Sequence, residues 1–207
     1  MAFSFPAKES VGALLMYLIV GDIAAILYYR KSADRVELKK LIIWIIVGIL
    51  IGVFILSKVD DAMLKSILGV LVLLLVVGEI FRYRLKLTVG SNYLRIAAGI
   101  AAGVATAIGN AAGPIMAVYL LLTGLDKHGF MGTTALLFCI VNLIKLPAFV
   151  FLGMIQPAYF NTFLFTFPLV LIGAIIGRRF IERISSTAFN FLILLFTAVA
   201  GILLLLS

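Results

Sequence analysis

Three polar residues lie deep within apolar stretches of this sequence. Lys145 and Asn142 are three positions apart in the stretch 132–152, and Asp22 lies near the middle of the stretch 11–29. Residues three apart share one face of a helix, so an ammonium and an amide could act together on an anion. An ionisable group within an apolar span is by default a candidate for transport or proton transfer. We expect Lys145 and Asn142 to bind an anion and Asp22 to couple a proton.

Each of these residues also has a structural interpretation. Lys145 could extend its stem toward the membrane surface or pair with a buried acid. Asp22 could relay protons, pair with Lys145, or simply hydrogen-bond a hydroxyl. Thr134 lies about two helical turns before Asn142 and is a further candidate for the anion site.

The run Gly109-Asn110-Ala111-Ala112-Gly113-Pro114 is a second candidate anion site. Glycine and proline break helices, so one helix should end here and another begin with Pro114 in its first turn. The N–H groups of Ile115 and Met116 would then face the break, where a helix N-terminus attracts oxyanions. The alternative is a purely architectural break that packs against its neighbours.

The composition indicates the elements that must position these residues. Of 207 residues, 64% are hydrophobic and only 13% are charged, so the chain is an integral membrane protein. Apolar stretches long enough to approach a full span occur at 11–29, 41–56, 63–81, 132–152, 160–177 and 188–206. We therefore predict an all-α polytopic membrane protein with about six transmembrane helices and a re-entrant helical hairpin at 94–124.

The distribution of basic residues predicts the hairpin. Lys and Arg total 17 against 9 Asp and Glu, and they gather at 30–40, 82–95 and 178–183. The positive-inside rule places these segments in the cytoplasm, so both ends of 94–124 are cytoplasmic and both chain termini are outside. A single kinked helix at 94–124 would instead place the arginines of 178–183 outside.

The chain also shows an internal repeat. Gly12 and Asp22 match Gly132 and Asn142 at an offset of 120, and the GxxxG motifs at 48–52 and 173–177 match at an offset of 125. The charge rule gives the two copies opposite orientations, as in many secondary transporters. The first repeat is 1–90, with three transmembrane helices, and the second is 91–207, with the hairpin and three more. The first repeat lacks a counterpart of the hairpin, which suggests either a shortened chain or a start assigned at an internal methionine.

An inverted repeat places Asp22 and Asn142 at equivalent positions and at similar depths from opposite sides of the membrane. We expect both to approach the hairpin tip at Asn110 and Gly113.

Two stretches carry a family resemblance. GNAAGPIMAVYLLLTGLDKHGFMGTTALLFCIVNLIKLPAFVFLG, at 109–153, resembles the second-half motif of the TauE/SafE family of sulfite exporters, and FPAKESVGALLMYLIVGDIAAILYYRKSAD, at 5–34, resembles its first half. The resemblance implies a transporter in the bacterial inner membrane that exports sulfite, an organosulfonate or a related sulfur compound. The missing first hairpin departs from the family, in which it helps to complete the central site.

Other functions find little support in the sequence. We expect no enzyme, since the serines lie at span ends or in loops and the chain has no P-loop pattern. We expect no cofactor, no metal site, since one histidine and one cysteine supply too few ligands, and no nucleic-acid partner. The expected partners are a small anionic substrate and the lipid bilayer, with a homo-oligomer left open. An anion channel and an accessory or assembly protein are the alternatives to a transporter.

Overall fold

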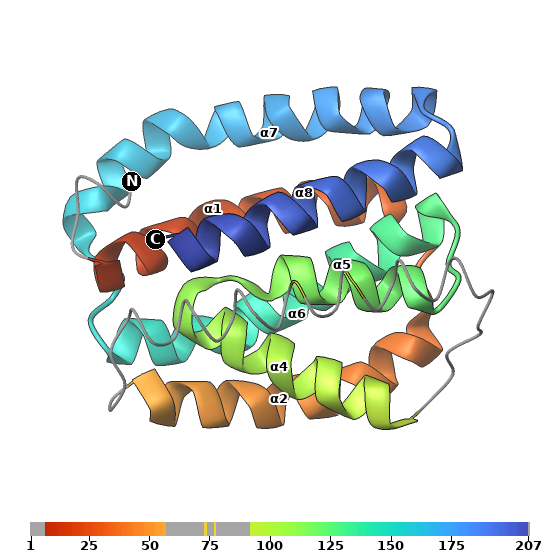
Figure 1. Cartoon of the computed structure of the whole chain (residues 1–207). Helices are drawn as coiled ribbons and strands as arrows, with labels where there is room; N and C mark the ends of the chain where they lie inside the picture. The colour runs from red at the N-terminus through yellow and green to blue at the C-terminus, as the bar shows by residue number, and fades with distance from the viewer. Residues whose placement is uncertain (1–6, 57–72, 74–76, 78–91, 207) are drawn as a thin grey trace. The chain divides into compact units, whose positions relative to one another are not determined.

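The computed structural model of the chain describes residues 7–56, 73, 77 and 92–206. These residues form seven α-helices and one short 3₁₀ helix, and they contain no strand (Figure 1). The chain is an all-α polytopic membrane protein, as predicted. The predicted span at 63–81 lies outside the described residues, apart from positions 73 and 77.

The helices follow the predicted apolar stretches in order. They are α1 (Ala7–Tyr29), α2 (Arg35–Leu56), α4 (Asn92–Gly109), α5 (Ala112–Leu122), α6 (Lys127–Phe151), η1 (Pro157–Tyr159), α7 (Phe160–Arg183) and α8 (Ser186–Leu206). Within the described residues, four segments are long and apolar enough to cross a membrane: Val11–Tyr29, Arg35–Ile55, Lys127–Phe151 and Pro157–Arg183.

Two helices extend past the apolar stretches into charged sequence. Helix α2 begins at Arg35, ahead of the predicted 41, and α7 continues to Arg183, past the predicted 177. Backbone hydrogen bonding does not stop at the hydrocarbon boundary, and charged side chains tolerate a helix in water. The arginines of 178–183 therefore lie in the last turns of α7, where Arg178 Nε is 2.7 Å from Glu182 Oε1, rather than in a loop.

Local signals fix several helix ends. Asp126 precedes α6 and its Oδ1 accepts a hydrogen bond from the Gly129 N–H at 2.9 Å, as an N-cap residue does. Ser185 precedes α8 and caps it through the Ala188 N–H at 3.2 Å. Gly153, just after α6, has a φ of +66°, a left-handed conformation that is typical of helix C-termini.

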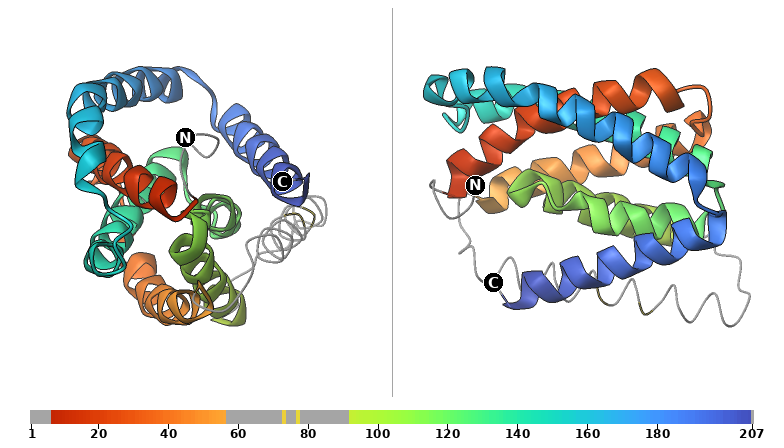
Figure 2. Two further views of the ribbon diagram at one scale, coloured as in Figure 1. Left: turned by 90° about the vertical axis from the view of Figure 1, so that its left-hand side faces the viewer. Right: turned by 90° about the horizontal axis from the view of Figure 1, so that it is seen from above.

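The chain divides into two compact units, and the first comprises Met1–Arg35 and Met131–Ile184. In this unit α1 packs along α7, as both views in Figure 2 show. The Tyr17 hydroxyl lies 2.7 Å from Thr166 Oγ1, and the Tyr17 ring meets Phe163 edge-on at 5.1 Å. Helices α1 and α6 share an apolar cluster of Leu15 and Phe149 with Met154.

The second unit comprises Val36–Phe130 and Ser185–Ser207. Its helices α4 and α5 lie side by side and are joined by a tight turn, so they form a helical hairpin (Figure 1). Helix α5 also packs on α8, where Val118 and Leu122 contact Leu194 and Ala198. The break between the two legs was predicted; that both ends of the hairpin face the same side of the membrane stays a prediction.

Each compact unit contains helices from both predicted repeats. The first unit joins α1 to α6 and α7, and the second joins α2 to the hairpin and α8. The units therefore do not follow the predicted boundary between 1–90 and 91–207, and the repeat stays a prediction.

Candidate functional site

The first unit brings together two of the predicted site residues, Asp22 of α1 and Asn142 of α6. The Asn142 Nδ2 donates a hydrogen bond of 2.7 Å to the Asp22 carboxylate. Asn142 is 3% exposed, so the amide is held between the helices rather than in solvent. Asp22 is half-buried, so its carboxylate loses part of its hydration, and the amide replaces some of the lost hydrogen bonding. The hydrogen bond of Asp22 is thus to an amide, not to the hydroxyl considered above.

Lys145 lies one helical turn after Asn142 and is 1% exposed. Its Nζ lies over the ring of Phe149, 5.5 Å from the centroid, and its charge interacts with that of Asp22. An ammonium within a protein is costly unless negative or electron-rich groups surround it. Lys145, Asn142 and Asp22 therefore form one polar cluster within otherwise apolar helices. We call these three residues the α1–α6 cluster.

Thr134 contributes a buried hydroxyl to the same helix. Its Oγ1 has no hydrogen-bond partner among the residues that the structure describes. The neighbouring Thr133 is fully buried, and its Oγ1 instead accepts a hydrogen bond of 2.8 Å from the Asp34 N–H. Thr133 thus ties α6 to the segment after α1. Nothing in the sequence distinguishes Thr133 from the adjacent Thr134, so its role was not predicted.

Glycines hold α1 and α6 close on both sides of this cluster. A Cβ at Gly12 would come within 1.9 Å of the Met154 carbonyl oxygen, and one at Gly132 within 2.4 Å of the Tyr29 oxygen and 2.8 Å of the Ala33 nitrogen. Such approaches are open only to glycine. The two helices therefore run antiparallel in contact, and this contact sets the distance at which Asp22 meets Asn142.

The hairpin tip in the second unit is built on Asn110. This residue has a φ of 55°, the left-handed region in which asparagine is among the few residues tolerated besides glycine. Its N–H donates to the Thr106 carbonyl at 3.2 Å, and the Ala111 N–H donates to the Ala105 carbonyl at 3.1 Å. These bonds close the end of α4 as a left-handed C-cap does. The break therefore depends on Asn110 at the end of α4.

Helix α5 begins at Ala112, so Pro114 lies in its first turn as predicted. The preceding residue, Ala111, makes no side-chain hydrogen bond to cap the helix. The N–H groups that have no carbonyl partner within α5 are therefore those of Ala112 and Gly113. The sequence had instead predicted that the free N–H groups would be those of Ile115 and Met116. A Cβ built at Gly113 meets no atom within 4 Å among the described residues, so this end of α5 is open on that side.

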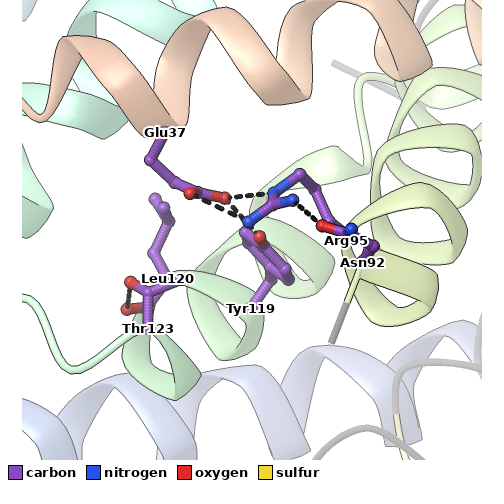
Figure 3. Close-up of polar contacts among 6 residues, drawn as sticks. All are labelled: Glu37, Asn92, Arg95, Tyr119, Leu120 and Thr123. Carbon is purple, nitrogen blue, oxygen red and sulfur yellow. Dashed lines mark hydrogen bonds and ion pairs between the residues drawn. The ribbon is translucent and has the colours of Figure 1, made fainter. Parts of the chain in front are cut away.

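A third polar group joins both legs of the hairpin to α2 (Figure 3). Arg95 of α4 forms an ion pair with Glu37. Its Nε lies 2.9 Å from Glu37 Oε1, and its Nη2 lies 3.4 Å from Glu37 Oε2. The Tyr119 hydroxyl of α5 donates to the same Glu37 Oε1. The Arg95 and Glu37 side chains are 16% and 11% exposed. We call Glu37, Arg95 and Tyr119 the hairpin anchor, which the sequence analysis did not anticipate.

The predicted site residues thus fall into two groups. The α1–α6 cluster and Thr134 belong to the first unit, whereas Gly109, Asn110, Gly113 and Pro114 belong to the second. That the two groups approach each other stays a prediction. The described residues contain no group of three or more His, Cys, Asp and Glu side chains that could hold a metal ion.

A comparison with protein families gives one match. The model of the family described as "Sulfite exporter TauE/SafE" matches residues 1–204. No curated protein and no solved structure matches the chain.

Proposed function

Because this chain belongs to the sulfite exporter TauE/SafE family of membrane transporters, we propose that it exports a small anion, namely sulfite, an organosulfonate or a related sulfur compound. The proposal combines the family with the chemistry of the polar groups that the chain holds inside its helices. It treats the chain as a secondary transporter that needs no nucleotide.

The observation that carries the proposal is the burial of Lys145 beside Asn142. A buried ammonium supplies the positive charge that an oxyanion needs in a site without bulk water. An amide nitrogen has two N–H donors, so Asn142 can hold Asp22 and an anion at the same time. The Thr134 hydroxyl, which has no partner among the described residues, is a further donor on α6.

The hairpin tip adds a second kind of anion contact to the proposal. The first-turn amides of α5 carry the partial positive charge of a helix N-terminus, and among the described residues there is open space beside Gly113. Four residues would form this part of the substrate site: Gly109, Asn110, Gly113 and Pro114. Asp22 would carry the proton if transport is proton-coupled, because it supplies the carboxylate of the α1–α6 cluster.

The direction of transport follows from the membrane potential. When the cell interior is negative, each unit of negative charge that leaves gains about 2.3 kcal/mol per 100 mV. Outward movement of an anion is therefore favourable without another energy source. We place the chain in the bacterial inner membrane because of its family. We place both termini outside because the basic residues gather on the other side of the predicted spans.

Efflux from proteoliposomes tests the proposal. Vesicles loaded with sulfite and given an inside-negative potential should release sulfite faster with the protein than without it. Lys145→Met keeps the bulk of the side chain and removes its charge, so it should reduce efflux to the protein-free rate. Lys127→Ala, which removes a lysine from the start of the same helix, is the matched control and should keep most of the activity.

The substrates released identify the mechanism. Saturable release of sulfite or a sulfonate, with chloride and sulfate retained, would support an exporter of sulfur anions. Equal release of all these anions would indicate a channel, and release at the protein-free rate in every case would contradict the proposal.

A further inference from the structure

Glu37 occupies an unusual position in the second unit, because its single carboxylate contacts both legs of the hairpin. One oxygen accepts from Arg95 of α4 and from Tyr119 of α5, and the other also faces Arg95 (Figure 3). Arg95 is held in turn by Asn92 Oδ1, which lies 2.5 Å from its remaining nitrogen. One acidic side chain thus joins three helices, and Glu37 as a whole residue is 9% exposed.

Glycines and backbone atoms form the closest approaches between α2 and α4. A Cβ at Gly48 would lie 2.2 Å from the Ile100 carbonyl oxygen, and one at Gly103 would lie 2.2 Å from the Ile45 oxygen. Such faces bring helices close but offer few side chains that interdigitate. These glycine faces keep α2 and α4 at a short distance. They do little to stop one helix from sliding along the axis of the other, because few side chains interlock. The ion pair and the tyrosine hydrogen bond are directional and hold that register.

We propose that the hairpin anchor positions the tip for transport, and that Glu37 is its central positioning residue. The inference rests on the proposed function. Arg95 lies in the first turn of α4 and Tyr119 lies two turns into α5, so the anchor fixes both legs relative to α2. Fixing both legs fixes the depth of Asn110 and Gly113, which lie at the turn between them. A buried ion pair contributes little net stability compared with apolar packing, so a role in geometry accounts for it better.

Two readouts in the same variants test the anchor. Ala111→Cys in a Cys139→Ser background places one thiol at the tip, and its rate of maleimide labelling in native membranes reports the position of the tip. Glu37→Gln and Tyr119→Phe should each change this rate several-fold. In the same proteins, the maximal rate of sulfite efflux should fall several-fold with little change in the apparent KM. The exchange Glu37→Arg with Arg95→Glu should restore part of both readouts.

The chain contains its own control. Arg178 and Glu182 form another arginine–glutamate pair, within α7 of the first unit. Glu182→Gln should therefore leave both labelling and efflux near the parent values. Labelling does not need transport, so it tests the anchor even if sulfite is not the substrate.

The proposal would be overturned by wild-type labelling in Glu37→Gln and Tyr119→Phe. It would also be overturned if Glu37→Gln merely lowered the amount of protein in the membrane while Tyr119→Phe matched the parent in both readouts.

Discussion

The side-chain amide of Asn142 donates a hydrogen bond of 2.7 Å to the carboxylate of Asp22, and the two residues are 120 positions apart. The same offset relates Gly12 to Gly132, which hold α1 and α6 together at opposite ends of their contact. Gly12 meets Met154, whereas Gly132 meets Tyr29 and Ala33. An inverted repeat predicts this reciprocity, because residues near its two-fold axis meet their own counterparts.

Exchange of the two central residues tests this relationship. Asp22→Asn alone and Asn142→Asp alone should each reduce transport by at least about tenfold, since a hydrogen bond to a charged group contributes about 1.5–3 kcal/mol. The double variant Asp22→Asn with Asn142→Asp restores a carboxylate–amide pair with the roles reversed. It should recover more efflux than either single variant. A double variant as poor as the worse single one would show that the two positions are not equivalent.

Removal of opposite charges should show that Lys145 and Asp22 stabilise each other. Lys145→Met leaves a carboxylate inside the helices without its cation, and Asp22→Asn leaves the cation without its carboxylate. Each single variant should lower the apparent melting temperature in detergent more than the double variant does. Additive losses in the double variant would mean that the two charges do not interact.

The two ends of 94–124 should lie on the same side of the membrane. In a Cys139→Ser background, single cysteines replace Tyr93 and Lys127. Both should react with a membrane-impermeant maleimide in inverted vesicles, and neither should react in intact cells. A cysteine replacing Gln156 is the control for the opposite side. Labelling of positions 93 and 127 from opposite sides would contradict the re-entrant hairpin.

The glycine contact between α2 and α4 should tolerate no added bulk. A side chain at Gly48 or Gly103 would collide with backbone, so Gly48→Val and Gly103→Val should each cost at least about 1–3 kcal/mol of stability. Gly173→Val is the control, because a Cβ there meets no atom within 4 Å among the described residues. The difference in stability is measured from the fraction of protein that stays soluble in detergent after heating.

A larger side chain at Gly113 should impair transport without affecting the fold. The space beside it among the described residues accommodates a side chain, so Gly113→Leu should assemble and unfold like the parent. Sulfite efflux should nevertheless fall several-fold, because the leucine would fill the space that the proposed anion uses. Normal efflux in this variant would show that the hairpin tip is not part of the substrate site.

The sequence was sufficient to predict most of the fold, because hydrocarbon imposes a simple rule on composition and length. The long apolar helices were predicted for this reason, whereas the break was predicted from the glycines and the proline of 109–114. The helix ends were less accurate where charged residues continue the helix, as in α2 and α7.

The hairpin anchor could not be predicted from the sequence. Glu37 is separated from Arg95 by 58 positions and from Tyr119 by 82, and nothing in the local pattern links them. A glutamate among lysines and arginines near a helix start is normally a solvated residue. The depth of Lys145 and Asn142, by contrast, follows from their place in one apolar helix, and the structure buries both.

The brevity of α5 has a consequence for how the protein is made. At 11 residues, α5 reaches only about 16 Å, roughly half the hydrocarbon thickness. The insertion machinery cannot release such a segment alone into lipid, because its terminal backbone groups would lack partners. Among the described residues it packs on α4, synthesised just before it, and on α8, synthesised after it. The contact with α8 therefore forms only after α5 has left the ribosome, so the hairpin completes its packing later than its own synthesis.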